Sequence, residues 1–528
     1  MSQQTWLDRA IGWVSPVRGA KRLRARAAIE ATADMRRAYE GAKRGRRTDG
    51  WFTSGSSADA EIAAAAPELR RRSRDLVRNN PWAKRGVSIW ASNLIGPGID
   101  PRAFRDDRSH EATKAINRLW WRWSLVADMR GHTDFAGLQT RAVRTMIESG
   151  EALVLREPRR ASRYLPIPMQ IQLVEPDRLD STRDSNSIKG GGWIAQGIEY
   201  DQDGVRKAYW ILPEHPGETR GPAIKRAESV RHKASDVAHL FDPQRAEQSR
   251  GAPWLAAAVM RLRDLDDYDD AELMAKKIAA CLAAFIINDE DNTGLGSTEI
   301  DHAGKTVESF EPGMVVRLGG AKDVKLAEPK GDGNYPNYMR VQLHAIAAAL
   351  DLPYELLTGD LSQVNFSSAR VGLIEFRRRV RQIQKQVIVP QLCLPVWRWF
   401  VDVAQASKAL PDDGKPIDAD WALPRFEAVQ PLDDEAASLM RMRIGKSSWE
   451  DEVSADGKDP DDVFDKIVDW NAKFDAKGVI LDCDPRHTAK SGAMQTSAPG
   501  TPQRSDDSLL AAAMNLVASR RMAETRIQ

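Results

Sequence analysis

Six acidic residues fall within nine positions of the chain, and they are the first groups to consider for chemistry. They are Asp264, Asp266, Asp267, Asp269, Asp270 and Glu272. Carboxylates this dense could hold divalent metal in a nucleic-acid-processing enzyme, but two-metal sites usually collect their carboxylates from several elements. On a helix, where residues advance by about 100°, these six positions wrap around the axis. Because like charges three or four residues apart repel, the cluster indicates either a solvated helix face or a helix that borders a wide aqueous space.

Other catalytic motifs are incomplete. Gly445-Lys446-Ser447 has the end of a phosphate-binding loop, but Met440 stands where the first glycine of that motif belongs. Asp482, Asp484 and His487 lie close together near the C-terminus, and we interpret them as a polar turn and not a metal site. No Ser/His/Asp or Cys/His arrangement can be assembled from local signatures. The residues therefore favour a protein that is not an enzyme and holds neither a metal nor a cofactor, with a metal-dependent nucleic-acid-processing enzyme as the alternative.

The composition indicates an ordered, multi-part chain. Its 528 residues correspond to about three to five domains or one elongated subunit. The 77 Lys and Arg residues against 75 Asp and Glu leave a net charge of +2, so only local charge could favour a nucleic-acid partner. Three cysteines without a CxxC motif fit a reducing compartment, and no apolar run of about 18 residues predicts a membrane span. The 16 tryptophans suggest extensive subunit contacts, with an ordinary core as the alternative.

The expected fold class is α+β and mainly helical. Two helices are expected between Ala60 and Ile95, separated at Asn80-Pro81 because the residue before proline avoids helix. Further helices are expected over Glu111–Val126 and Phe135–Ser149. Short β-rich runs then follow up to Leu212, with a hairpin turn at Asp201–Gly204.

Two long helical segments dominate the second half of the chain. From Pro253 to Ile287 neither Gly nor Pro recurs, which predicts a helix of roughly 33 residues and about 50 Å. Residues Ala369–Lys408 form the second segment, which Pro390 and Pro395 should kink. Two very long helices with a turn-rich excursion between the first and the next helix are typical of an assembly subunit.

A series of short segments carries a family resemblance. They are RDLVRNNP (74–81), NLIGPGI (93–99), EPDRL (175–179), GIEYD (197–201), RGAPWL (250–255), RDLDDY (263–268), LPYELLTGD (352–360) and NFSSAR (365–370). In this order, and together with the two long helices, they resemble the lambda-type portal proteins of tailed bacteriophages and prophages. The resemblance spans about Ala60 to Lys473, and none of its segments is a catalytic signature.

The resemblance implies a ring-forming fold, typically of about twelve copies, at one capsid vertex. Double-stranded DNA would pass through its central tunnel during packaging and ejection, without base-specific contacts. The implied partners are the terminase large subunit, the major capsid or scaffold protein, and head-completion and tail adaptor proteins. The implied location is the virion after synthesis in the host cytoplasm, with no membrane partner.

The family's parts can be assigned along the chain in order. They are a basic N-terminal arm (1–59), an α+β wing (60–252), a first stem helix (253–287), a clip (288–333), a second stem helix (334–352), a tunnel-loop region (353–368), a long wing helix (369–408), the remaining wing and crown (409–493) and a flexible tail (494–528). The basic arm is either a solvated segment or one that binds phosphates.

Three sets of site residues follow from this assignment. The DNA-facing tunnel loop would contribute Asp360, Gln363, Asn365, Phe366, Ser367 and Arg370. The six acids named above would line the channel. The terminase-facing clip would contribute Glu290, Asp291, Lys305, Glu308, Arg317 and Lys322. DNA carries one negative charge per about 1.7 Å of axis, so an acidic tunnel would let it slide where a basic one would hold it. The alternative is that the acids pair with Arg263, Lys276 or Lys277 of the next subunit.

Overall fold

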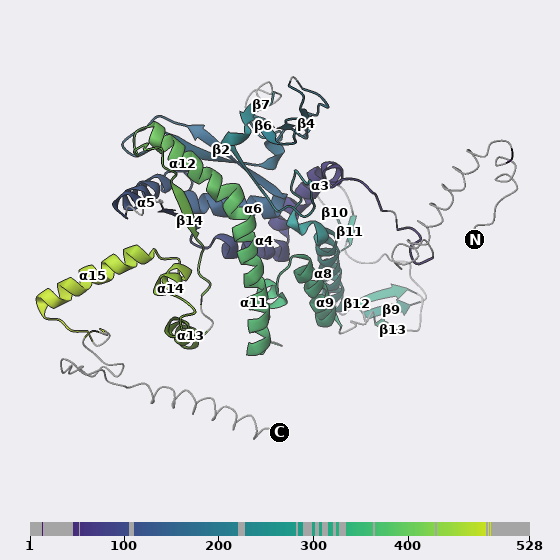
Figure 1. Cartoon of the computed structure of the whole chain (residues 1–528). Helices are drawn as coiled ribbons and strands as arrows, with labels where there is room; N and C mark the ends of the chain where they lie inside the picture. Colours follow the sequence, from purple (N-terminus) through teal and green to yellow (C-terminus); the bar gives the residue numbers. More distant parts are fainter. Residues whose placement is uncertain are drawn as a thin grey trace. The chain divides into compact units, whose positions relative to one another are not determined.

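The computed structural model describes Trp13, residues 46–51, 53–104, 110–188, 190–219, 228–280, 334–362, 365–427 and 430–481, residues 484 and 486, and the backbone of five short strands between 284 and 326. Figure 1 labels the helices and strands. The chain divides into two compact units, each described by itself. The first comprises Met1–Val87, Thr145–Leu153 and Val174–Asp360, and the second comprises Ser88–Arg144, Val154–Leu173 and Leu361–Gln528.

The helical start of the first unit follows the predicted boundary. Helix α3 (Ala58–Asn79) begins after Ser57, whose hydroxyl accepts a hydrogen bond from the Ala60 N–H at 3.3 Å. It ends at Asn80, and α4 (Pro81–Ile95) starts with the proline. The Asn80 side-chain oxygen accepts a hydrogen bond from the Ala83 N–H at 2.9 Å and so caps α4. The prediction of a break at Asn80-Pro81 is confirmed.

An antiparallel sheet of four strands forms the β part of the first unit. Its order is β4 (Trp193–Ala195), β5 (Ile198–Tyr200), β6 (Arg206–Ile211) and β7 (Val230–Lys233). The predicted hairpin turn joins β5 to β6, and the Asp201 carboxylate accepts hydrogen bonds from the N–H groups of Asp203 and Val205. The 3-10 turns η2 (Pro176–Arg178) and η3 (Ala234–Asp236) flank this region. The buried strand β8 (Val237–Phe241) lies beside the start of β2 (Glu151–Pro158).

The first long helix is shorter than predicted. After a 3-10 turn, η4 (Trp254–Ala257), helix α8 covers only Val259–Ala280, and strand β9 (Ala284–Asn288) occupies the expected helix end. The prediction of helix up to Ile287 is wrong because the aromatic and β-branched run in β9 favours a strand and pairs on both sides. Its neighbours are β12 (Val315–Gly319), which is parallel, and β13 (Val324–Leu326), which is antiparallel.

The rest of the first unit agrees with the expected order of elements. Strands β10 (Thr298–Ile300) and β11 (Thr306–Glu308) form an antiparallel pair. Helix α9 (Tyr335–Ala349) follows, contacts α8 and leads into the short α10 (Tyr354–Thr358). Gly359, at φ +74°, ends α10 in the left-handed conformation that glycine adopts without strain.

The second unit contains the long helix predicted over Ala369–Lys408. It consists of α11 (Phe366–Ile383), the π-helical segment η5 (Gln384–Cys393) and α12 (Leu394–Ala406), drawn as one continuous run in Figure 1. Pro390 lies within η5, and the wider π turn accommodates its missing N–H. The 38 residues Ala369–Ala406 are long and apolar enough to cross a membrane, but 56% of the apolar window is buried in the chain. The helix therefore has the burial of a core helix.

Aromatic rings form the centre of the second unit. Trp120 of α5 (His110–Ser124) lies 5.0 Å from Trp123, 5.3 Å from Phe135 of α6 (Phe135–Ser149), 5.3 Å from Trp397 and 5.0 Å from Phe400, measured between ring centroids. The indole N–H of Trp123 donates to the Met169 carbonyl at 2.8 Å. The tryptophans in this cluster thus serve the unit's own core, which was the alternative to subunit contacts.

Several elements of the second unit were not predicted. Strand β1 (Asp100–Phe104) pairs with β14 (Asp418–Ala422), about 300 residues later in the chain. Strand β3 (Met169–Val174), in contrast, was one of the expected short β-rich runs, and it pairs with β2. Helices α13 (Pro431–Arg443) and α15 (Pro460–Lys477) were expected, whereas α14 (Trp449–Ala455), which starts at a Ser448–Asp451 capping box, was not. The observed class, mixed α+β and mainly helical, confirms the prediction.

Candidate functional site

Tyrosines join α8 to α9 in the first unit. The ring of Tyr268 on α8 lies 4.4 Å from that of Tyr338 and 6.0 Å from that of Tyr335, between centroids. The Tyr335 hydroxyl donates a hydrogen bond to the Asp269 carboxylate at 2.7 Å, and the Lys276 ammonium lies 4.6 Å from the Tyr335 ring centroid. This hydrogen bond is the main cause that raises the pKa of Tyr335 to about 12. The two helices are therefore held by aromatic and ionic contacts at this level.

Two of the six α8 acids have partners on other elements. Asp269 accepts the Tyr335 hydrogen bond, and Asp266 accepts one from the Asn80 amide at 2.7 Å. Burial raises the pKa of Asp266, although the Asn80 hydrogen bond opposes this effect. Because Asn80 also caps α4, its side chain connects the start of that helix to α8.

The other four acids lie on the exposed and half-exposed parts of α8. Asp267 pairs with Arg263 at 2.9 Å and Glu272 with Lys276 at 3.5 Å, both within the helix. Asp264 and Asp270 are exposed and have no ionic or hydrogen-bonding partner among the described residues. Two acids of the cluster are thus available to a passing ligand or a neighbouring molecule.

The geometry does not favour a metal site at the α8 acids. Among the described residues, the group of potential metal ligands that lie within 4.8 Å of one another is Glu175, Asp177 and His215, and it includes no α8 residue. The Arg74 guanidinium already contacts both carboxylates of that group, at 3.3 Å for Glu175 and 2.6 Å for Asp177. A cation in this position replaces the charge that a metal ion would supply.

The predicted tunnel-loop residues fall into three groups. Asp360 is held in the first unit: its N–H donates to the Thr358 hydroxyl at 3.1 Å, and its carboxylate lies 3.4 Å from the Tyr354 hydroxyl and 3.9 Å from the Arg340 guanidinium. Asn365 is exposed. Gln363 lies outside the described residues, and Phe366 and Ser367 are described by their backbone alone, at the start of α11.

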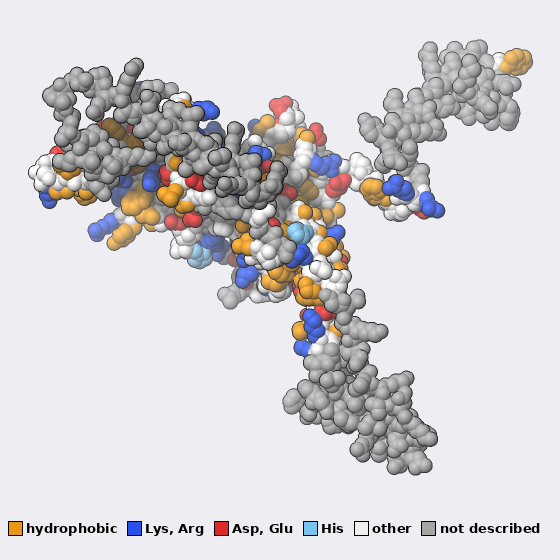
Figure 2. Space-filling model, turned by 90° about the horizontal axis from the view of Figure 1, so that it is seen from below, with side chains coloured by type: hydrophobic (Ala, Val, Ile, Leu, Met, Phe, Trp, Pro, Cys, Tyr) orange, Lys and Arg blue, Asp and Glu red, His pale blue; other side chains and the backbone are white. Residues whose placement is uncertain are grey.

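Arg370 belongs to the second unit and contacts α13. Its guanidinium donates to the Gln430 side chain at 3.2 Å and lies 3.5 Å from the Asp434 carboxylate. Part of its charge is therefore balanced within the chain. On the face seen in Figure 2, hydrophobic, acidic and basic side chains are intermixed, without a broad basic area among the coloured residues.

The predicted clip residues lie mostly outside the described part of the chain. Glu290, Asp291, Lys305 and Lys322 are in that group. Glu308 ends strand β11 and Arg317 lies in β12, where the backbone alone is described.

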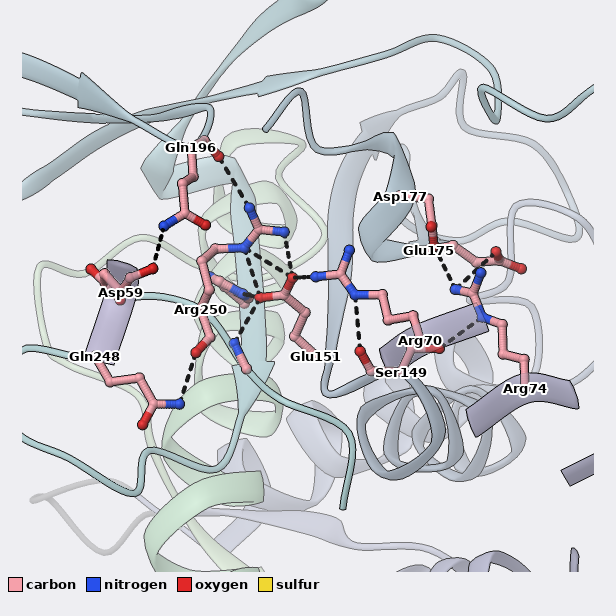
Figure 3. Close-up of polar contacts among 12 residues, drawn as sticks. Asp59, Arg70, Arg74, Ser149, Glu151, Glu175, Asp177, Gln196, Gln248 and Arg250 are labelled. Atoms are coloured by element: carbon pink, nitrogen blue, oxygen red, sulfur yellow. Dashed lines mark hydrogen bonds and ion pairs between the residues drawn. The ribbon is translucent and has the colours of Figure 1, made fainter. Parts of the chain in front are cut away.

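Sequence reasoning missed a buried ionic cluster directly before α8 (Figure 3). Glu151, at the start of β2, receives hydrogen bonds from Arg250 at 2.5 and 2.9 Å and from Arg70 of α3 at 2.6 Å. The His239 ring on β8 lies 2.9 Å from the same carboxylate, and the Gly251 N–H donates to it at 3.0 Å. The side chains of all four charged or titratable residues are at most 6% exposed. Such buried charges persist only when each has partners.

Burial and the neighbouring charges together set the protonation states of Glu151 and His239. Burial alone would raise the pKa of Glu151, but Arg250, the His239 hydrogen bond and Arg70 together hold it well below its usual range. Burial lowers the pKa of His239, and the nearby Arg206 and Arg250 guanidinium groups act in the same direction. The histidine is therefore neutral at pH 7 and donates through Nε2. Its other ring nitrogen, Nδ1, is buried without a hydrogen-bond partner among the described residues.

The cluster fixes the chain segment that leads into α8. Ser249 is held by the Asp59 carboxylate through its N–H at 2.8 Å and its hydroxyl at 2.6 Å. At Gly251, a Cβ atom would lie 2.0 Å from the Gly150 carbonyl oxygen, so only glycine fits there. The RGAPWL segment itself did not indicate this approach, because neither the burial of Arg250 nor the contact of Gly251 with Gly150 can be read from the local sequence.

Comparison with known families decides the identity of the chain. The model of the family described as phage portal protein, lambda family, matches residues 44–384, which include the buried cluster, α8 and α9. The chain belongs to the lambda family of phage portal proteins. This membership confirms the resemblance predicted from the short segments, and it confirms that the protein is a structural one and not an enzyme.

Individual phage portal proteins are similar to this chain over most of the length of both sequences. The probable portal protein of Halomonas phage phiHAP-1 is 27% identical over 467 residues, which cover 84% of this chain and 88% of that protein. Portal protein B of Escherichia phage lambda is 22% identical over 474 residues, covering 79% and 86%. Among solved structures, the neck of an empty GTA particle computed with C6 symmetry has a TM-score of 0.39 at 15% identity, over 74% of this chain and 94% of that one. The neck of a native GTA particle computed with C12 symmetry gives 0.39 at 15%, over 75% and 96%.

Proposed function

We propose that this portal protein assembles into a ring of about twelve copies at one vertex of a phage capsid and conducts double-stranded DNA during packaging and ejection. Family membership supports this function. The observation in the molecule that supports it best is the pair of exposed carboxylates without partners, Asp264 and Asp270, on α8. In the proposed ring, α8 and α9 are the stem helices and these carboxylates face the channel.

Carboxylates along a channel suit a conduit better than a binding protein. DNA phosphates and carboxylates repel each other, and at physiological salt this repulsion reaches about 8 Å. A ring repeats each acid once per subunit, so two free acids give two charged rings. Basic residues at these positions would instead release counterions and hold the DNA. The intrahelical pairs of Asp267 and Glu272 leave fewer negative charges on α8 than its sequence suggests.

The remaining parts of the proposal concern partners. The strands between Ala284 and Leu326 would form the clip that docks the terminase large subunit. Head-completion and tail adaptor proteins would dock later, and the major capsid or scaffold protein would surround the ring in the virion. Residues 353–370 would form the tunnel loop against the DNA backbone, with Asp360 and Arg370 restrained by the contacts given above.

The function is tested with the assembled protein. Native mass spectrometry of the wild-type chain should give a ring of about twelve subunits. The double variant Asp264→Asn/Asp270→Asn should form the same ring but package DNA more slowly, or retain it differently, in a reaction with its terminase and capsids. Asp267→Asn is the matched control, because Asp267 is already paired with Arg263. A wild-type chain that never forms rings would contradict the proposed assembly, and unchanged packaging and retention in the double variant would contradict the channel role of the acids.

A further inference from the structure

A strongly basic loop connects two neighbouring strands, β2 and β3. The chain reads RRASRY over residues 159–164, and every one of these residues is exposed. Three of the six are arginines, Arg159, Arg160 and Arg163. Tyr164 is 78% exposed, and the Arg163 guanidinium lies 5.8 Å from its ring centroid. Because the whole chain has a net charge of only +2, local charge of this kind is what could favour a nucleic-acid partner.

The backbone of this loop has a defined shape. Arg159, directly after β2, donates its N–H to the carbonyl of Pro168, directly before β3, at 2.9 Å. Ser162 and Leu165 then bond each other in both directions, N–H to carbonyl, at 3.1 and 3.2 Å. These bonds close a four-residue turn with Arg163 at one of its two corners. The arginines are therefore carried by a turn that the backbone holds in place.

A glutamine brings a fourth arginine beside the loop. The Gln170 side-chain amide donates to the carbonyls of Val126 and Asp128 at 2.9 and 3.2 Å. Its oxygen accepts a hydrogen bond from Arg159 Nε at 3.3 Å. Arg130, two residues after Asp128, is exposed. All these residues belong to the second unit. We define the basic patch as Arg130, Arg159, Arg160 and Arg163.

The positive charges of the basic patch are not balanced within the described part of the chain. None of its four side chains forms an ion pair with a described carboxylate. Asp128 is 2% exposed at its side chain, accepts the N–H groups of Arg130 and His132, and lies 3.5 Å from the Arg141 guanidinium. Glu157, near the end of β2, is half-buried. The patch therefore presents an excess of positive charge at the surface.

We propose that the basic patch binds the phosphate backbone of double-stranded DNA, at a site separate from the α8 acids. Guanidinium groups suit this ligand because their forked N–H donors match phosphate oxygens. Protein interfaces usually bury an apolar centre, whereas the exposed residues 158–164 include no large aliphatic side chain. In the proposed assignment of the family's parts, the loop belongs to the wing and the α8 acids belong to the stem. The site therefore goes beyond the proposed channel.

The test measures binding of the full chain to closed circular duplex DNA of mixed sequence, by filter binding over a series of salt concentrations. Circular DNA cannot be threaded through a closed ring, so its binding reports on surfaces outside a channel. For Arg159→Gln/Arg160→Gln/Arg163→Gln we expect affinity at about 100 mM salt to fall at least tenfold, and the slope of log K against log salt to become shallower by about 0.9 for each phosphate contact removed. The melting temperature should stay unchanged, because the side chains are exposed and backbone bonds hold the loop.

A matched control separates the position of the arginines from their charge. Arg71→Gln/Arg72→Gln/Arg378→Gln removes the same number of exposed arginines, but each of these is paired with a glutamate in the wild type. This variant should bind circular DNA as the wild type does. An equal loss of affinity in this control and in the patch variant would overturn the inference, because overall charge would then explain both.

Two further variants complete the test. Arg159→Lys/Arg160→Lys/Arg163→Lys keeps the charge and should retain most of the salt dependence. Asp264→Asn/Asp270→Asn should leave the binding of circular DNA unchanged, since these acids belong to the proposed channel. A wild-type chain that does not bind circular DNA, or a patch Gln variant that binds it as tightly as the wild type, would overturn the inference.

The outcomes also distinguish this site from its alternatives. A patch Gln variant that binds DNA normally but fails in capsid assembly would assign the patch to an acidic protein partner and overturn the inference. A chain that never forms rings but binds circular DNA through the patch would contradict the proposed assembly while supporting this site.

Discussion

Arg250 and Glu151 form a buried ion pair in which the guanidinium Nε and Nη2 lie 2.9 and 2.5 Å from the same carboxylate oxygen. This pair joins β2 to the segment that enters α8. A second arginine, Arg70, contacts the same oxygen from α3. One carboxylate therefore faces two guanidinium groups, one from α3 and one from the segment that enters the proposed stem helix α8.

Removing the charge of Glu151 should severely destabilise the first unit. In Glu151→Gln, two buried guanidinium groups lose their counter-charge, and breaking a buried ion pair in this way costs about 3–5 kcal/mol. Denaturant unfolding followed by circular dichroism measures the loss. Glu175→Gln is the control, since Glu175 is exposed and its salt bridge to Arg74 should contribute less than about 1 kcal/mol. Equal stability of the two variants would contradict the role given to Glu151.

The neutral His239 predicts a loss of stability at mildly acidic pH. Burial lowers its pKa in the folded chain, so between the ordinary value near 6.5 and the lower folded value only the unfolded state binds the proton. Stability should fall as the pH drops through this window, with a slope of at most about 1.4 kcal/mol per pH unit from this group. His239→Gln should flatten the dependence between pH 7 and 5, and His132→Gln, at an exposed position, is the control for the loss of a histidine. An identical pH slope in all three proteins would exclude His239 as the cause.

The hydrogen bond between Tyr335 and Asp269 should contribute to the pairing of α8 with α9. Tyr335→Phe keeps the ring contacts and removes only the hydroxyl, so a cost of about 1–2 kcal/mol is expected for a hydrogen bond to a charged acceptor. Thermal unfolding of the variant and the wild type measures this loss of stability. Tyr338→Phe removes a hydroxyl from the adjacent ring of the same cluster and should change stability by less than half as much. A larger loss in the Tyr338 variant would show that the hydroxyl of Tyr335 is not the important one.

Local signals along the chain predicted much of the fold. The break at Asn80-Pro81 and the hairpin at Asp201–Gly204 depend on residues within one turn of each other, and both are confirmed. The predicted length of α8 was wrong. The pairing of strand β9 with β12 and β13 overrides the lack of helix-breaking residues in this segment. The pairing of β1 with β14 was missed because the two strands are separated by more than 300 residues along the chain.

The buried cluster was missed for a related reason. Arg70, Glu151, His239 and Arg250 come from four distant segments, and charged residues are usually assigned to the surface. The α8 acids were noticed from the sequence, but not that Asp266 and Asp269 accept hydrogen bonds from Asn80 and Tyr335. Each of these contacts is decided by tertiary packing, which no local pattern encodes.

Asn80 should be more sensitive to substitution than its neighbour Asn79. Its side chain caps α4 through the Ala83 N–H and also donates to Asp266. Loss of a helix cap costs about 0.5–2 kcal/mol, and Asp266 would lose its partner as well, so Asn80→Ala should cost more than a cap alone. Asn80→Asp keeps the capping oxygen but places a second carboxylate against Asp266, so it should also destabilise, and less so at low pH where one of the two is protonated. Asn79→Ala, which removes only an exposed contact to Asp75, should change stability by less than about 0.5 kcal/mol.

Gly251 gives the sharpest steric test of the segment that enters α8. A Cβ atom there would lie 2.0 Å from the Gly150 carbonyl oxygen and 2.6 Å from its carbonyl carbon, so the backbone would have to move. Movement would also displace the Gly251 N–H that donates to Glu151 at 3.0 Å. We expect Gly251→Ala to cost at least about 3 kcal/mol and to reduce ring assembly in proportion to the folded fraction. Gly55→Ala is the control, because no atom lies within 4 Å of the added methyl group. A Gly251→Ala protein that unfolds at the same denaturant concentration as the Gly55→Ala protein would mean that this close approach does not hold the segment in place.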